Sequence, residues 1–251
     1  MRELFADILE PVTTRDADTP RVEVDTISLL VPTRQRPAQL ERFMRSAVEF
    51  AERPDAVEFV VYVDRDDNSY DEFALPDRTV VAAGDRITLS ECWNRCHAAA
   101  AGPIFGHMGD DIVFRTPSWD RIVRDVFDAC EDRIVFVHGA DGIQNDRLGT
   151  HGFLHARWVD TLGYFVPPYF SSDFNDTWLT EVADRIGRRV YVPNLLTEHL
   201  HFSVGKAEID QNTVDRLVRH QADGVADRYA ELRDERAADA EKLAAVIGGR
   251  S

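Results

Sequence analysis

The stretch "FGHMGDDIVF", residues Phe105–Phe114, places two adjacent carboxylates between two apolar runs. Its β-forming and apolar residues predict a buried strand over 104–114, with His107 as an outward-facing residue of that strand. Asp110 and Asp111 then lie at the edge of the hydrophobic core. Such a pair is either a solvated turn or a site that holds a divalent cation through hard oxygen ligands.

Strand and helix patterns alternate along the first part of the chain. Strands are predicted at 26–32, 57–64, 78–84 and 133–139, and helices at 37–53, 88–101 and 118–130. This alternation predicts the α/β class, with a mainly parallel, Rossmann-like central sheet flanked by helices. Ligands of such sheets bind beyond the carboxyl ends of the strands. Acids collect at those ends, namely Asp64, Asp66, Asp67, Asp110, Asp111 and Asp141.

The residue composition of the sequence changes after residue 140. The following part is rich in glycine, aromatic and polar residues, which is typical of a loop-rich substrate region, with a helix at 176–187 and a strand at 189–194. We therefore expect four segments: an N-terminal extension (1–25), a ligand-binding half (26–140), a second, catalytic half (141–206) and a C-terminal helical tail (207–251). The tail is expected to form one long helix or to fray.

The amino-acid composition restricts which partners the protein is expected to bind and in which cellular compartment it is expected to work. The 251 residues carry 29 Lys and Arg against 45 Asp and Glu, a formal charge of −16, so duplex DNA is disfavoured although a local contact is possible. Three cysteines favour a reducing compartment, and Cys92 and Cys96 are expected to be buried thiols one helical turn apart. No signal peptide or membrane span is recognised, so we expect a soluble, cytoplasmic protein that does not contact a membrane.

Two histidines and two further acids add candidate ligands and bases. In "EHLHF", His199 and His201 point the same way if the segment is extended, and imidazole beside carboxylate favours Mn²⁺ over Mg²⁺. Asp173 and Asp176 lie at a predicted helix start. They are either N-terminal caps or, for Asp176, a general base presented from the helix end.

Five segments, in this order, resemble the family-2-like glycosyltransferases of the GT-A fold. They are "ISLLVPTRQRP", "VVYVDRDDNSYDE", "GPIFGHMGDDIVF", "GYFVPPYFSSDFNDTWLTEVADRIG" and "EHLHF", which together span about residues 26 to 203. The family has a nucleotide-binding α/β half followed by an acceptor-binding half. The end "EHLHFSVGKAEID" is similar to glycosyltransferases of phages and actinobacteria. If the protein is phage-encoded, the expected compartment is the host cytoplasm.

The resemblance implies residue roles. Asp111 would ligate the metal, with His199 or His201 as a further ligand, and Asp176 would be the base, with Asp173 as the next candidate. The residues implied to hold the nucleotide sugar are Pro32, Thr33, Arg34, Asp64 with Asp66 as its rival, Arg86, Asn94 and Asp110. Two departures stand out: Asn175 replaces the usual Glu before the base, and Gly109 replaces the first acid of the DxD motif.

The activity implied is an inverting transfer, dependent on Mn²⁺ or Mg²⁺. A sugar would move from a UDP- or GDP-linked donor to a hydroxyl of a modified DNA base, a protein or a small molecule. One alternative is a metal-dependent nucleotidyltransferase, although "PTRQRP" (residues 32–37) lacks the glycines of a phosphate loop. The other is a non-catalytic sugar- or protein-binding module, which would not need Asp111 or Asp176.

Overall fold

The computed structural model describes residues 25–249, so the predicted N-terminal extension, apart from its last residue, lies outside the described residues. This part of the chain forms an eight-stranded sheet of order β3-β2-β1-β4-β7-β6-β8-β5. The strands are β1 (Ile27–Thr33), β2 (Val57–Asp64), β3 (Thr79–Gly84), β4 (Ile104–His107), β5 (Ile112–Phe114), β6 (Phe136–Ala140), β7 (Gly152–His155) and β8 (Arg189–His199).

Parallel pairing dominates the sheet. β3, β2, β1 and β4 are parallel neighbours, as are β6 and β8, whereas β7 runs antiparallel between β4 and β6. The first three predicted strands are confirmed within one residue. The predicted α/β class with a mostly parallel sheet is confirmed.

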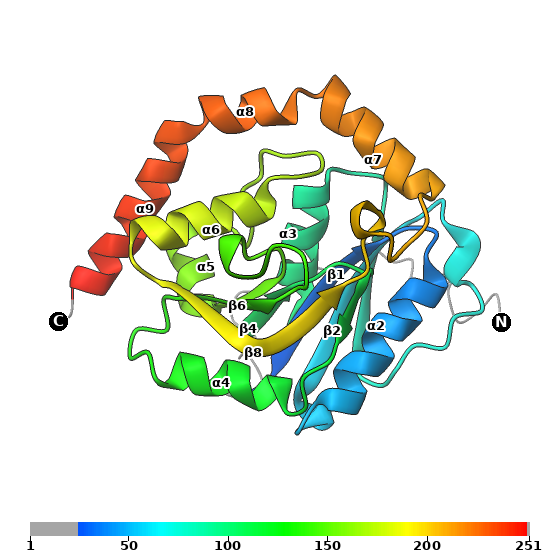
Figure 1. The fold of residues 1–251 in the computed structure, drawn as a ribbon, viewed down its shortest axis with the longest axis horizontal. Helices are drawn as coiled ribbons and strands as arrows, with labels where there is room; N and C mark the ends of the chain where they lie inside the picture. Colours follow the sequence, from blue (N-terminus) through cyan, green and yellow to red (C-terminus); the bar gives the residue numbers. More distant parts are fainter. Residues whose placement is uncertain (1–24, 250–251) are drawn as a thin grey trace.

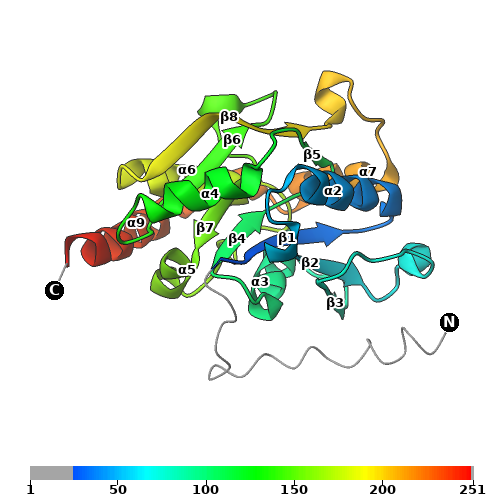
Figure 2. The same cartoon turned by 90° about the horizontal axis from the view of Figure 1, so that it is seen from below.

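Helices cover both faces of the sheet (Figures 1 and 2). On one face, α2 (Pro37–Phe50) and α4 (Trp119–Asp128) bury Leu40, Phe43, Trp119 and Phe127 against the strands. On the other face lie α3 (Leu89–Ala99), α5 (Ala156–Leu162) and α6 (Asn175–Arg185), with a second core cluster. Each helix presents an apolar stripe to the sheet, which is what the helical spacing of its apolar residues requires.

The prediction of one strand over 104–114 is wrong. β4 ends at His107 and β5 begins at Ile112, and β5 pairs antiparallel with β8 and not with the strands beside β4. Met108, Gly109, Asp110 and Asp111 therefore form a connection between two strands. The outward-facing assignment of His107 is also wrong: its side chain is buried, and its ring lies 4.0 Å from that of Trp93 between centroids.

The later part of the chain holds more regular structure than its composition indicates. β7 and α5 were not predicted, and β8 continues to His199, beyond the predicted end at 194. The register of β6 against β8 shifts at Gly139, where a Cβ would lie 1.9 Å from the carbonyl oxygen of Leu195. Gly139 therefore permits the close approach that lets β8 cross from β6 to β5.

The C-terminal tail is three helices and not one. α7 (Gln211–Ala222), α8 (Val225–Glu231) and α9 (Arg233–Gly248) form an arc along one side of the molecule in Figure 1. Gly224 breaks the helix with φ at 55°, a conformation that glycine adopts without strain. The carboxylate of Asp239 on α9 accepts hydrogen bonds from Tyr164 and Trp178, which ties the arc to α6.

Two further predictions concern the state of the cysteine thiols and the presence of membrane-spanning helices. Cys92 and Cys96 are buried free thiols on α3, as predicted. Within residues 25–249, no helix has the length and hydrophobicity needed to cross a membrane.

Candidate active site

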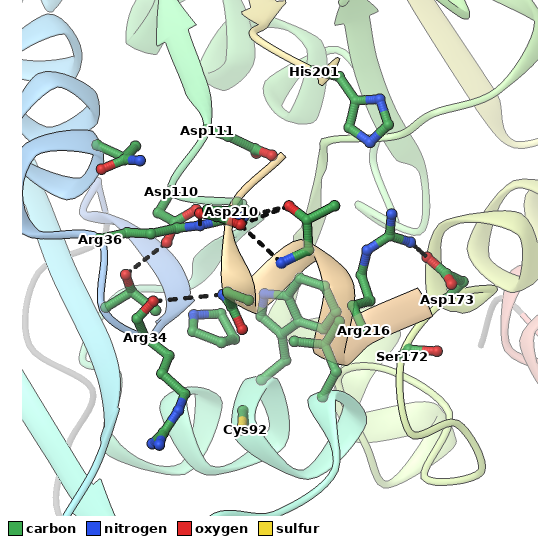
Figure 3. A pocket seen from close by; sticks show the side chains of 18 of the residues that line it. Arg34, Arg36, Cys92, Asp110, Asp111, Ser172, Asp173, His201, Asp210 and Arg216 are labelled. Atoms are coloured by element: carbon green, nitrogen blue, oxygen red, sulfur yellow. Dashed lines mark hydrogen bonds and ion pairs between the residues drawn. The ribbon is translucent and has the colours of Figure 1, made fainter. Parts of the chain in front are cut away.

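A cavity of about 540 Å³ opens at the carboxyl ends of β1, β2 and β4. Its walls come from the turn after β1, the 108–111 connection, the start of α6 and the segment that leads into α7 (Figure 3). Basic side chains line it in a protein whose overall charge is −16, among them Arg36, Arg86, Arg216 and Arg219. Seven basic and seven acidic side chains line the cavity, so its formal charge is balanced in a molecule whose overall charge is −16, and its arginines can contact an anionic ligand.

Asp110 is fixed on one wall of this cavity. Its carboxylate accepts a hydrogen bond from Thr33 Oγ1 at 2.6 Å and one from Arg36 Nη1 at 3.2 Å. Burial raises the pKa of Asp110, while the Arg36 charge opposes that shift. Thr33 also lies 2.7 Å from the hydroxyl of Tyr70. Because its oxygens are engaged by the protein, Asp110 is suited to shape the wall and to offer a lone pair to a ligand hydroxyl.

Arg34 joins the acids that follow β2. Its guanidinium donates to Asp64 at 2.7 Å and to both oxygens of Asp66 at 2.6 and 3.1 Å. Burial raises the pKa of Asp64 despite Arg34, whereas the hydrogen bond from Arg34 lowers that of the exposed Asp66. Asp64, Pro32, Thr33 and Arg34 line the cavity and Asp66 does not, so the geometry favours Asp64 over its rival.

Asp111 lies beside a pair of histidines. Asp111, His151 and His199 bring one potential ligand atom each to within 4.8 Å of one another. Asp111 Oδ2 is 3.4 Å from His199 Nε2. Burial alone would raise the pKa of Asp111, but the hydrogen bond and charge of His199 hold it below its ordinary value. Burial lowers the pKa of His151 to about 3, so its imidazole is neutral, as a metal ligand must be.

The donor set tests whether a divalent cation fits. One carboxylate and two imidazoles with their ligand atoms gathered suit Mn²⁺ and similar ions. Asp141 lies behind His199: its Oδ2 is buried without a hydrogen-bond partner and sits 4.0 Å from His199 Nδ1. Its Oδ1 accepts three backbone N–H bonds from residues 143–145. A fixed carboxylate there favours the proton on Nδ1 and leaves Nε2 free to bind a metal.

His201 lines the cavity near the same group. Its ring centroid is 5.0 Å from that of His199, which agrees with the prediction that the two rings share one side. Its Nδ1 is engaged by Ser203, at 2.7 Å from the hydroxyl oxygen. Figure 3 shows His201 and Asp111 on the same side of the cavity.

The two candidate bases differ in their surroundings. Asp173 is held by Arg216 and His220, each 2.6 Å from one of its oxygens. Asp176, in the first turn of α6, lines the cavity, and its side chain accepts hydrogen bonds from the backbone N–H and the hydroxyl of Thr177. Burial raises the pKa of Asp176 to about 6. Among the described residues no cation pairs with Asp176, so its carboxylate has the surroundings that a general base requires, whereas Asp173 is engaged by two cationic side chains.

Of two further residues predicted to bind the ligand, one lines the cavity and the other does not. Arg86 lines the cavity, paired with Asp215 of α7 at 3.1 Å. Asn94 is not brought to the cavity: its Nδ2 donates to the carbonyl of Val166 and its Oδ1 accepts from the N–H groups of Phe165 and Val166. Both ends of this amide are used to hold a loop, so Asn94 has a structural role.

Three features of the site escaped the sequence analysis. His151 was not singled out, because no spacing links it to Asp111. Arg36 belongs to the same "PTRQRP" turn as Arg34, a signal that could have found it. Arg216 and Asp210 lie in the tail, whose composition gives no sign that α7 covers the cavity.

Comparisons with known proteins identify the fold. No family model matches the chain, and no curated protein matches its sequence. A solved mannosyltransferase from Pyrobaculum calidifontis, in complex with GDP-mannose and Mn²⁺, superposes with a TM-score of 0.59 at 13% identity. That match covers 100% of this chain and 84% of the other.

Two structures of TarS from Staphylococcus aureus also match. Both have a TM-score of 0.52 and cover 68% of this chain, at 12% and 13% identity, and the second is residues 1–349 in complex with UDP. The matched parts cover 36% and 59% of those two chains. The chain therefore has a GT-A-like glycosyltransferase fold, as its sequence motifs predicted.

Proposed function

We propose that this protein is an inverting, metal-dependent glycosyltransferase that uses a UDP- or GDP-linked sugar and a hydroxyl acceptor. One observation carries the proposal. A single cavity at the carboxyl edge of a glycosyltransferase fold is lined by Asp111 and His151 of the Asp/His metal-type group and by Asp176, a carboxylate with a raised pKa and no cationic partner among the described residues.

In the proposed reaction, the Asp176 carboxylate accepts one proton. The acceptor oxygen forms a bond to the anomeric carbon as the bond from that carbon to the diphosphate oxygen breaks. The acceptor proton passes to the Asp176 carboxylate, and the bonding electron pair leaves with the diphosphate. Attack on the face opposite the leaving group inverts the anomeric centre. A base of this kind contributes roughly 10²–10⁴-fold to the rate.

The donor diphosphate carries negative charge that grows as the sugar bond breaks. Asp111 and His199 would hold Mn²⁺ or Mg²⁺, which when bound supplies Lewis-acid stabilisation of that charge. Arg36, Arg86 and Arg216 line the same cavity and add fixed positive charge. These cations offset the repulsion between the diphosphate and the acids of the site.

The nucleoside is assigned to the turn after β1. Pro32, Thr33 and Arg34 line the cavity there and would contact the nucleoside, and Asp64 would accept a base N–H. Asp110, which also lines the cavity, would accept from a ribose hydroxyl. Near Asp176, Ser172 Oγ and Asn175 Nδ2 are buried, lack hydrogen-bond partners and belong to residues that line the cavity. They are suited to bind hydroxyls of the acceptor or of the transferred sugar.

A panel of UDP- and GDP-sugars with Mn²⁺ tests the proposal. We expect slow release of UDP or GDP from one donor by the wild type, a thermal shift with that donor, and loss of both in Asp111→Ala. In Asp176→Asn, the donor-induced thermal shift should persist while turnover falls. Release of pyrophosphate would instead favour nucleotidyl transfer. Absence of any nucleotide-sugar shift would favour a binding module that lacks catalysis.

A further inference from the structure

We infer that His151 is a third metal ligand of the site proposed above, and that Gly109 is the residue that lets it bind. The resulting site has one carboxylate and two imidazoles, and it selects a Mn²⁺-like ion over Mg²⁺. This inference rests on the proposed function only for the use of the metal. The binding of the ion itself can be measured without any sugar donor.

The pairing of β4 with β7 brings His151 to Asp111. In this antiparallel pair His107 stands opposite Gly152. Antiparallel strands continue in opposite directions, so His151, which precedes Gly152, lies beside the connection that follows His107. The β5–β8 pair brings His199 from the other side, since Ile112 stands opposite His199. The two strand pairs therefore deliver one imidazole each to the carboxylate between β4 and β5.

Gly109 leaves the space that these ligand atoms occupy. A Cβ built on Gly109 would lie 2.7 Å from Asp111 Oδ1 and 3.3 Å from His151 Nε2. Real Cβ atoms do not approach other heavy atoms at the first distance, so a side chain at 109 would displace the Asp111 carboxylate. The acid missing from position 109 is thus replaced by an imidazole from the residue that precedes β7, whose Nε2 lies beside the glycine.

The His151 side chain has the features of a ligand and not of a core residue. Only 7% of the residue is exposed, and its Nδ1 has no hydrogen-bond partner. Its ring meets that of His199 edge to face, with centroids 4.9 Å apart. The buried His151 and the partly buried His199 each bring a ligand atom to within 4.8 Å of a carboxylate oxygen of Asp111, which is the arrangement that a shared cation requires.

The types of ligand atom determine which class of divalent metal ion the site prefers. Imidazole nitrogen is a favourable ligand for Mn²⁺, Fe²⁺, Co²⁺ and Zn²⁺, whereas Mg²⁺ prefers oxygen ligands and keeps its waters. A single ligating carboxylate also leaves net positive charge and open positions for diphosphate oxygens. Asp141 acts as a positioning residue, because its unpartnered Oδ2 faces Nδ1 of His199 and not the cavity.

Direct binding of Mn²⁺ to the full chain, followed by electron paramagnetic resonance without nucleotide, tests the inference. His151→Ala should weaken Mn²⁺ binding at least ~10-fold, and Asp141→Asn by roughly 10–100-fold. His201→Ala is the matched comparison, because this cavity histidine lies outside the Asp111, His151 and His199 group and its Nδ1 is engaged by Ser203, and its Mn²⁺ binding should stay within about twofold of wild type. Gly109→Ala should weaken Mn²⁺ binding without removing any ligand. Thermal unfolding in EDTA identifies variants that fail to fold.

Two further measurements complete the test. Bound Co²⁺ should show absorption bands that change in His151→Ala, and Mg²⁺ should displace Mn²⁺ only at more than about 100-fold excess. The inference is overturned if His151→Ala and Gly109→Ala bind Mn²⁺ as the wild type does, if His201→Ala loses binding instead, or if Mg²⁺ competes equally. Normal metal binding with no response to any nucleotide sugar would instead overturn the proposed function and leave this site intact.

Discussion

Arg36 Nε lies 2.7 Å from Asp210 Oδ2, which joins the turn after the first strand to the residue that caps α7. The same guanidinium reaches Thr213 and Asp110, so one side chain connects the wall of the cavity to its cover. The Arg36 side chain is 16% exposed, and the two acids that it pairs are distant in sequence. This contact fixes how α7 closes the site.

Removal of Arg36 should loosen that cover. Arg36→Ala leaves the buried Asp110 carboxylate without its cation, and we expect a loss of about 3 kcal/mol in the free energy of unfolding. The donor KM should rise as well, since the cap of α7 loses its anchor. Arg53→Ala is the control, because Arg53 pairs with Asp25 where both side chains are half exposed, and it should change stability much less than Arg36→Ala does. Equal effects of the two substitutions in urea unfolding would contradict this role.

The pH dependence of transfer should report Asp176. Burial raises the pKa of this carboxyl to about 6, and a base works only when it is deprotonated. The rate constant kcat should therefore fall as pH decreases through about 6, well above the range of an ordinary aspartate. Asp176→Asn should lower turnover by roughly 10²–10⁴-fold and remove this limb of the profile. A profile that is flat from pH 7 to 5 would exclude Asp176 as the base.

The burial of Asp176 also destabilises the folded protein, and a neutral side chain at this position should remove that effect. A raised carboxyl pKa means that the ionised form destabilises the folded state as pH rises through about 6. The free energy of unfolding of Asp176→Asn at pH 8 should therefore exceed that of the wild type by about 3 kcal/mol, and its unfolding temperature should be higher. The difference should vanish below about pH 4, where the wild-type carboxyl is protonated in both states. Calorimetry at both pH values checks the sign.

Thiol labelling should separate the three cysteines. Burial raises the pKa of Cys92 to about 12 and that of Cys96 well above its ordinary value, so neither forms a thiolate in the native protein at pH 8. Cys130 is partly exposed and should react first with an aromatic disulfide reagent. Cys130→Ser should then react only as fast as the protein unfolds. Rapid labelling of this variant would show that α3 opens in the native state.

Two glycines provide a matched pair for backbone packing. Gly139→Ala would place a Cβ 1.9 Å from the carbonyl oxygen of Leu195, and we expect a loss of more than about 3 kcal/mol because β8 must move. Gly248→Ala, at the end of α9 with nothing within 4 Å, should be neutral or slightly stabilising. Urea unfolding of both variants tests whether the β6–β8 crossing is as tight as described.

The sequence by itself determined the local elements and the edge of the sheet that carries the site. The apolar runs of β1 and β2 and the helical stripe of α2 are local patterns, and periodicity identifies them because each depends on its own residues. The acids after β2 and after β4 also stand where parallel strands end, so Asp64 and Asp111 could be named as candidates. The glycosyltransferase fold followed from the order of those motifs.

The tertiary structure alone decided which side chains meet. His151 reaches Asp111 only through the register of β4 against β7, and Asp173 is engaged only because α7 folds back with Arg216 and His220. The same holds for Asn94, whose amide is used by a loop far along the chain. Strand register and helix docking are set by long-range packing, which leaves no signal in the spacing of nearby residues. The choice between Asp173 and Asp176, and between His199 and His201, therefore depends on contacts that the linear pattern does not contain.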